Sequence, residues 1–222
     1  MEPTADLWHH YGRIRARRDR AVPDAFRWTW GQDGGPGTEL LGDVTGLRVG
    51  DLGAGPARQA AYLAARCRPA RVDAIDGSPA QHARATALYG HLAPRLRLVH
   101  ADAATHLRTA PDTYDVLYSI FGATDFTDPR ALLPAAATAL RPGGRLVFST
   151  LARYRDGSPA QPDAVPADIP ARTPDGGEAT MRRWVLQPRV WTDLLTRAGL
   201  TRITTHREPG TLLLTAHRPR HP

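Results

Sequence analysis

An acid and two glycines follow directly after a short apolar run. The stretch VGDLGAGPARQAAYLA, residues 49–64, contains Asp51, Gly53 and Gly55 and then runs into residues that favour a helix. Glycine at a strand-to-helix turn lets a ligand approach the backbone closely, because no Cβ stands in the way. The spacing therefore predicts a binding site for a small ligand at the start of this helix.

The neighbours of these glycines discriminate between classes of cofactor. A nicotinamide or flavin dinucleotide uses G-x-G-x-x-G, but Arg58 stands where the third glycine belongs. A carboxylate at Asp51 would repel a pyrophosphate and attract a cationic ligand. A nicotinamide-dependent oxidoreductase is therefore the disfavoured alternative.

Two more acids close strand-like runs further along the chain. Asp76 ends RVDAID and precedes Gly77, and Asp102 ends LVHAD and precedes Ala103. Ligands of parallel α/β sheets bind at the carboxyl ends of strands, so we expect the three acids along one edge of a sheet. The alternative is that each acid only caps a turn or a helix, as Asp102 would for a helix beginning at Ala103.

The elements that must position these acids alternate along the chain. This alternation predicts a doubly wound, mostly parallel sheet, and EPGT before the last apolar run predicts an antiparallel hairpin. We therefore expect an α/β, Rossmann-like, seven-stranded sheet with a C-terminal hairpin. The expected strands are Leu47–Leu52, Arg71–Ile75, Leu96–His100, Asp115–Ser119, Arg145–Leu151, Leu200–Arg207 and Leu212–His217, and the expected helices between them lie near Arg58–Arg68, Pro79–Leu92, Ala103–Thr109 and Pro129–Leu140.

Two segments lie outside this alternation. Residues 1–46 combine a helical start with an aromatic stretch and a glycine-rich loop. Residues 152–180 are rich in Pro, Gly, Asp and Ala, which predicts a long loop. We therefore divide the chain into an N-terminal helical segment, 1–46, and an α/β domain, 47–222, with a loop insertion at 152–180.

Composition excludes some classes of protein. The chain has 222 residues, a net charge of +7 and one cysteine, Cys67, and its 29 basic residues are all arginine. The arginines are densest between residues 13 and 20, where a solvated surface is favoured over a basic arm for nucleic acid. One cysteine excludes an iron–sulfur site or a cysteine-based zinc cluster and fits a reducing compartment, and no metal is expected.

Without a signal peptide or membrane span in the sequence, we expect a cytoplasmic protein that binds neither membrane nor nucleic acid; a homodimer is compatible with these features.

The motifs, taken in order, resemble those of class I S-adenosylmethionine-dependent methyltransferases over roughly residues 47–217. VGDLGAGPA is similar to the first motif, with Ala57 where that family often has a third glycine. YDVLYSIFGA and LRPGGRLVFS resemble the fourth motif and the stretch before the fifth strand. The resemblance implies S-adenosylmethionine as the cofactor.

The resemblance also implies roles for individual residues. Asp76 would bind the two ribose hydroxyls, Asp102 the adenine amino group, and the amide of Ala103 a ring nitrogen. An aromatic side chain can pack on adenine or attract the sulfonium, and Trp28, Trp30 and Tyr11 are candidates; the alternative for the two tryptophans is a place in the core. The cofactor-binding residues expected are Asp51, Gly53, Gly55, Asp76, Gly77, Asp102, Ala103, Ser119 and Trp30.

The family comparison also narrows the acceptor. SIFGA, residues 119–123, replaces the D/N-P-P-Y motif of amino methylases, no cysteine lies near that position, and the chain has no lysine for a catechol-type metal site. We therefore predict methylation of an O, N or C atom of a small molecule, which could be a specialised metabolite, with residues 1–46 as a lid and Tyr154 beside the acceptor. A peptide or nucleic-acid acceptor is the alternative.

Catalytic residues for methyl transfer are hard to identify from sequence, because a sulfonium methyl group is already activated. Alignment of the two reactants supplies much of the rate enhancement. If a base is required, His9, His10 and Tyr11 are the candidates, since histidine titrates near neutral pH. Asp125 could orient an acceptor amine or hydroxyl. The alternatives are an exposed histidine pair and a helix-capping role for Asp125.

Overall fold

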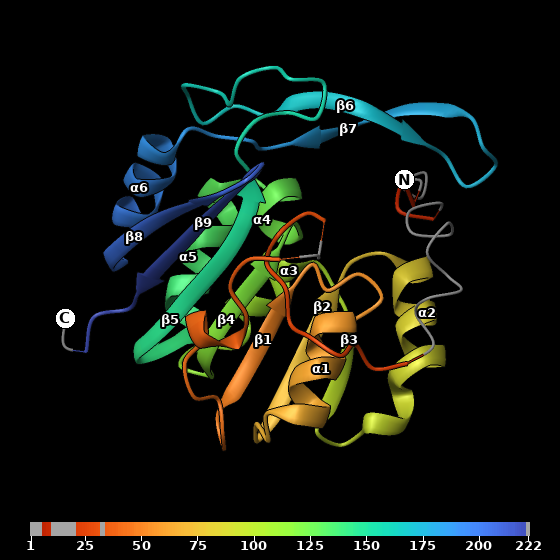
Figure 1. The fold of residues 1–222 in the computed structure, drawn as a ribbon, viewed down its shortest axis with the longest axis vertical. Coiled ribbons are helices and arrows are strands. Elements are labelled where there is room, and N and C mark those ends of the chain that lie inside the picture. The colour runs from red at the N-terminus through yellow and green to blue at the C-terminus, as the bar shows by residue number, and fades with distance from the viewer. Residues whose placement is uncertain (1–5, 10–20, 32–33, 221–222) are drawn as a thin grey trace.

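The computed structural model describes residues 6–9, 21–31 and 34–220, and a seven-stranded sheet forms its centre (Figure 1). The strands lie in the order β3-β2-β1-β4-β5-β9-β8; the first five are parallel, and β9 is antiparallel to both β5 and β8. The Rossmann-like sheet with a C-terminal hairpin is confirmed. Its strands are β1 (Arg48–Leu52), β2 (Arg71–Asp76), β3 (Leu96–His100), β4 (Tyr114–Ile120), β5 (Leu140–Leu151), β8 (Thr201–Glu208) and β9 (Thr211–His217).

Helices cover both faces of the sheet, because strands buried on both faces need an apolar layer on each side. One core packs α1 and α2 with the aromatic residues Phe26 and Trp28 against the sheet, and the other packs α3, α5 and α6 against the opposite face. Trp28 is fully buried and its indole N–H donates to the Gly37 carbonyl at 2.8 Å, so Trp28 is a core residue. The helices are α1 (Arg58–Arg66), α2 (Pro79–Tyr89), α3 (Ala103–Arg108), α4 (Ala123–Phe126), α5 (Pro129–Ala139) and α6 (Pro188–Arg197), with short 3-10 turns at Thr38–Leu40 and Gly90–Leu92.

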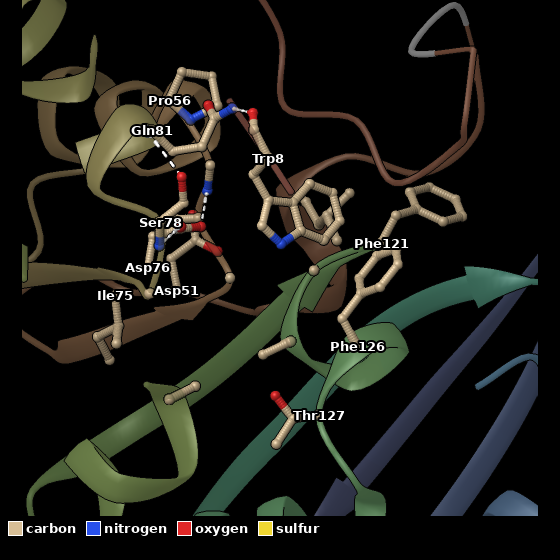
Figure 2. A pocket seen from close by; sticks show the side chains of 18 of the residues that line it. Trp8, Asp51, Pro56, Ile75, Asp76, Ser78, Gln81, Phe121, Phe126 and Thr127 are labelled. Atoms are coloured by element: carbon tan, nitrogen blue, oxygen red, sulfur yellow. Dashed lines mark hydrogen bonds between the residues drawn. The ribbon is translucent and has the colours of Figure 1, made fainter. Parts of the chain in front are cut away.

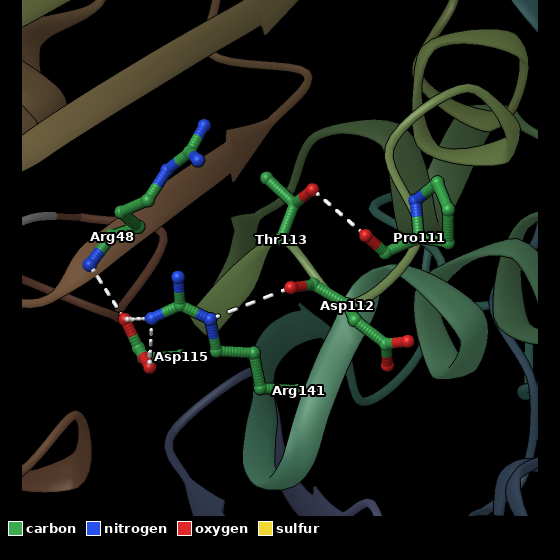
Figure 3. Close-up of polar contacts among 6 residues, drawn as sticks. All are labelled: Arg48, Pro111, Asp112, Thr113, Asp115 and Arg141. Atoms are coloured by element: carbon green, nitrogen blue, oxygen red, sulfur yellow. Dashed lines mark hydrogen bonds and ion pairs between the residues drawn. The ribbon is translucent and has the colours of Figure 1, made fainter.

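A polar cluster fixes the amino end of the sheet, away from the strand ends that carry the three acids (Figure 3). Asp115, at the start of β4, accepts a hydrogen bond from the Arg48 amide of β1 at 2.8 Å. The Arg141 guanidinium contacts both oxygens of the same carboxylate, at 2.9 and 3.1 Å. Asp115 therefore joins β1, β4 and β5 at one point.

The segment 152–180 is not simply the loop expected from its composition. It contains β6 (Ala167–Arg172), which pairs antiparallel with β7 (Glu178–Arg183) in a separate two-stranded sheet above the carboxyl ends of the main strands (Figure 1). Burial alternates along both strands, and TPDGG between them forms the turn. Pro170 is tolerated because a two-stranded sheet consists only of edge strands. The high proline and glycine content concealed a hairpin whose period-2 alternation is visible in ADIPAR and EATMRR.

The helical start expected for the N-terminal segment is not seen in its described residues. Within 6–9, 21–31 and 34–46 the structure has no α-helix, only the 3-10 turn at Thr38–Leu40, and residues 10–20 lie outside the described residues. Residues 6–9 form a turn against the start of α2. In the part of the chain that the structure describes, every helix is too short or too polar to cross a membrane.

Candidate active site

A cavity of about 760 Å³ opens where β1, β2 and β4 end (Figure 2). It lies at the edge of the sheet where the sequence places the three acids. Of the residues predicted to bind the cofactor, all but Ser119 line this cavity, namely Asp51, Gly53, Gly55, Asp76, Gly77, Asp102, Ala103 and Trp30. We call it the cofactor cavity.

The glycine turn after β1 is shaped by a close approach of two backbone segments. Gly53 has a φ of +75°, and a Cβ at this position would lie 2.2 Å from the amide nitrogen of Ala123. Any side chain there would push apart the ends of β1 and β4. Gly53 therefore lets the ends of β1 and β4 lie in close contact at the cavity, which is a packing reason for glycine at this position.

Asp76 connects the glycine turn to the start of α2. Its Oδ2 accepts a hydrogen bond from the Gly55 amide at 2.7 Å, and its Oδ1 accepts one from the Ser78 amide at 2.9 Å (Figure 2). Burial raises the pKa of Asp76, and these two backbone donors oppose that rise. Each oxygen keeps acceptor capacity toward the cavity, which suits a ligand with neighbouring hydroxyl groups.

Asp51 is a buried acid on the floor of the cofactor cavity. Only 4% of its surface is exposed, and its Oδ2 accepts a hydrogen bond from the Tyr118 hydroxyl at 2.8 Å. Burial raises the pKa of Asp51 to about 7, an effect that Tyr118 opposes and the nearby Asp76 increases. A cationic ligand would compensate this buried charge, since an opposite charge favours the ionised form.

Asp102 does what the capping alternative proposed, and it also lines the cavity. Its Oδ1 accepts a hydrogen bond from the Thr105 amide at 2.8 Å, so it is the N-cap of α3. The two interpretations are compatible, because a capping carboxylate keeps a second oxygen. The cap of α2 is Ser78, whose hydroxyl accepts from the Gln81 amide.

Residues 6–8 cover the cofactor cavity through contacts that the sequence did not reveal. Asp6 accepts hydrogen bonds from the Ser78 hydroxyl at 2.9 Å and the Ala80 amide at 3.1 Å. The Trp8 carbonyl accepts from the Gln81 side chain at 3.0 Å, and the Trp8 ring meets Phe126 edge to face at 4.5 Å. In Figure 2 the Trp8 ring lies between the acids and Phe126. The only sequence signal was an aromatic residue beside the histidine pair.

Two predicted site residues lie inside the fold and line neither cavity. Ser119 is fully buried and donates a hydrogen bond to the Leu52 carbonyl at 2.7 Å, so it joins β4 to β1 without reaching the cavity. Asp125 is also fully buried and forms an ion pair with Arg183 at 2.6 Å. Burial raises the pKa of Asp125, and Arg183 lowers it. Asp125 lines neither cavity, and its carboxylate holds Arg183 in place.

Of the three predicted bases, only His9 lies within the described residues, and it is not at the site. His9 is half-buried and lines neither cavity, and His10 and Tyr11 lie outside the described residues. A base role for His10 or Tyr11 stays a prediction.

A second cavity of about 1220 Å³ lies beneath the β6–β7 hairpin. Leu7, Trp8, Trp30 and Phe126 line both cavities, so the two share an aromatic wall. The second cavity also includes Tyr154, whose hydroxyl donates to the Arg183 carbonyl at 3.2 Å. We call it the acceptor cavity, because it adjoins the cofactor cavity and is where we propose that a second ligand binds.

Comparison with known proteins agrees with this geometry. Residues 49–144 match the family model described as a methyltransferase domain. The chain is 36% identical over 120 residues to a trans-aconitate 2-methyltransferase of Streptomyces avermitilis, covering 51% of this chain and 44% of that protein. It is 32% identical over 165 residues to a protein of the same name from Paracidovorax citrulli, covering 72% of this chain and 61% of the other.

The fold also resembles solved structures of methyltransferases. An S-adenosylmethionine-dependent methyltransferase from Mesorhizobium loti superposes with a TM-score of 0.61 at 21% identity, over 81% of this chain and 94% of that one. Residues 49–144 therefore match a methyltransferase domain, and the fold of the chain is that of class I S-adenosylmethionine-dependent methyltransferases. The chain spans about half the length of the curated relatives it matches.

Proposed function

We propose that this chain transfers the methyl group of S-adenosylmethionine to an O, N or C atom of a small molecule. The observation that carries the proposal is that Asp51, Asp76 and Asp102 line one cavity, which shares an aromatic wall with a second. The three acids lie in or just after the last residues of three neighbouring strands. The trans-aconitate methyltransferases it resembles are named for a small-molecule acceptor. A cytoplasmic location, a specialised-metabolite acceptor and a homodimer stay predictions.

The residues of the cofactor cavity fit S-adenosylmethionine. The Asp76 oxygens have acceptor capacity for the ribose hydroxyls, and Gly55 brings a turn without a side chain to the wall of the cavity. The buried carboxylate of Asp51 suits the positive charge of the ligand. When bound, S-adenosylmethionine would supply a methyl group that a lone pair of the acceptor attacks in line, with S-adenosylhomocysteine as the leaving group.

The contribution of the chain to the reaction is alignment and exclusion of water. Trp8 and Phe126 meet at 4.5 Å, and Trp30 and Phe121 meet edge to face at 5.1 Å, so aromatic rings surround the boundary between the cavities. Rings at this position keep water away from the reacting groups. Holding two reactants in one geometry supplies several kcal/mol or more of the barrier.

The test is turnover. The purified protein is incubated with methyl-labelled S-adenosylmethionine and pools of small metabolites, and mass spectrometry follows the label. We expect label in a small molecule and formation of S-adenosylhomocysteine. Label found only in added peptide or RNA would favour the alternative acceptors, and label in no acceptor at all would contradict the proposal.

A further inference from the structure

The charged side chains of the acceptor cavity are dominated by arginine. Its charged residues are Arg155, Asp156, Arg172, Glu178 and Arg183. Arg172 and Glu178 face each other in the register of the β6–β7 hairpin, so their charges offset one another at the rim. Asp156 is exposed and accepts a hydrogen bond from the Ser158 amide at 2.8 Å, which directs it into its own turn. Arg155 and Arg183 remain as groups that could meet an acceptor.

These two arginines converge on one aromatic ring. The guanidinium carbons of Arg155 and Arg183 each lie 5.3 Å from the centre of the Trp30 ring. Arg183 also lies 5.0 Å from the centre of the Phe126 ring. Because both rings line both cavities, the two guanidinium groups stand next to the boundary where a methyl group would be transferred.

Arg183 is oriented by the protein before any ligand binds. Its side chain is only 5% exposed, and its Nε and Nη2 both donate to Asp125 Oδ2, at 3.1 and 2.6 Å. Its Nη1 has no hydrogen-bond partner within residues 6–9, 21–31 and 34–220. Arg155 likewise forms no ion pair with the described part of the chain. The cavity therefore presents guanidinium N–H donors that its own carboxylates do not occupy.

This arrangement discriminates between classes of acceptor. A cationic amine would lie against two arginines, and the faces of Trp30 and Phe126 that could attract it are already next to guanidinium groups. A neutral acceptor would leave the donors without an anionic partner. A carboxylate accepts charge-assisted hydrogen bonds from arginine, which are about twice as strong as neutral ones.

We propose that Arg155 and Arg183 bind a carboxylate of the acceptor, so that the substrate is a small carboxylic acid with its reactive atom at the aromatic wall. This inference rests on the proposed methyl transfer. Asp125 is then a positioning residue, which acts by holding Arg183 in place. The methylated atom can be the carboxylate oxygen itself or a nearby atom that the bound carboxylate orients.

The experiment measures acceptor binding to protein saturated with S-adenosylhomocysteine. Calorimetry first records binding of S-adenosylhomocysteine; its failure would contradict the proposed function and not this inference alone. The probes are then added as matched pairs: trans-aconitate, benzoate and cinnamate, each against its own amide, which keeps the shape and loses the charge. We expect at least one acid to bind roughly tenfold or more tightly than its amide.

The variants separate a specific contact from the general positive charge. Arg155→Gln should weaken binding of that acid about fivefold to tenfold and leave its amide and S-adenosylhomocysteine unchanged. Arg153→Gln is the matched control, because Arg153 is exposed, lines neither cavity and carries the same charge two residues away. Arg183→Lys keeps a cation beside Asp125 but removes the paired N–H donors of the guanidinium. This variant should also weaken binding of the acid.

Three outcomes would overturn the inference. The first is that no acid binds better than its amide, including the case in which no acid of the panel binds. The second is equal weakening by Arg155→Gln and Arg153→Gln, which would indicate only the general field of the protein. The third is unchanged acid binding in both Arg155→Gln and Arg183→Lys.

Discussion

At the scale of residues, the site depends on carboxylates whose environments differ. Asp76 is held by two backbone amides, Asp102 caps a helix, and Asp51 is buried with one hydroxyl partner. Their acidic side chains and their positions near the ends of predicted strands were sufficient to predict that the three acids line one site. Sequence could not distinguish Ser119 and Asp125 from such residues, because the partners of Ser119 Oγ and Asp125 Oδ2 inside the fold, Leu52 and Arg183, are distant in the chain.

Asp51 should make binding of S-adenosylmethionine depend on pH. The pKa of Asp51 is about 7, so the carboxylate that attracts a sulfonium is lost as the pH falls through 7. Affinity should therefore fall by up to about tenfold between pH 8 and pH 6, while S-adenosylhomocysteine, whose sulfur is neutral, changes less. Calorimetry of both ligands across this range measures the ratio of the two affinities.

Asp51→Asn is the matching variant. This variant should flatten the pH dependence of the ratio of S-adenosylmethionine affinity to S-adenosylhomocysteine affinity. It should also lower this ratio at pH 8. It should also raise the free energy of unfolding of the ligand-free protein at pH 8 by on the order of 1–3 kcal/mol, because it removes a buried charge whose folded-state pKa is raised. An unchanged pH dependence in Asp51→Asn would show that another group titrates.

At the scale of elements, the β6–β7 hairpin and α4 are joined by a buried ion pair. Arg183 on β7 pairs with Asp125 on α4, and the Trp184 amide donates to the Asp125 carbonyl at 2.7 Å. The parallel strands were predictable because apolar runs and turns repeat in order. The hairpin was not, because prolines and glycines mask its alternation, and the cover formed by Asp6 and Trp8 depends on contacts more than 70 positions apart.

Arg183→Met should destabilise the protein by roughly 3–5 kcal/mol, because it leaves the Asp125 carboxylate buried without a partner. Denaturation by urea measures this change. Arg182→Met is the control, since Arg182 is exposed on the same strand and should change stability by about 0.5 kcal/mol or less. Similar destabilisation by both variants would contradict the role of the ion pair.

At the scale of the whole molecule, one edge of the sheet carries two cavities that meet at Trp8, Trp30 and Phe126. The net charge of +7 belongs to the entire chain, and the acceptor cavity itself contains both signs of charge. A small acceptor contacts only a few of these charges, whereas a nucleic acid would displace many counterions.

Acceptor binding should therefore depend only weakly on salt. Once an acceptor is found, its dissociation constant should change by no more than a few fold between 50 and 200 mM salt, against roughly 10³-fold or more for a ligand making 6–10 phosphate contacts. A steep fall in affinity with salt would instead favour a nucleic-acid acceptor.

The central claim is that the edge of the sheet with the three acids binds S-adenosylmethionine, and Asp76→Ala tests it most directly. Calorimetry should show that the unaltered chain binds S-adenosylmethionine and not NAD, and that Asp76→Ala weakens this binding by about 1.5–3 kcal/mol. Asp115→Ala, at the opposite end of the sheet, should leave the affinity unchanged. Full affinity in Asp76→Ala, or binding of NAD in place of S-adenosylmethionine, would contradict the account.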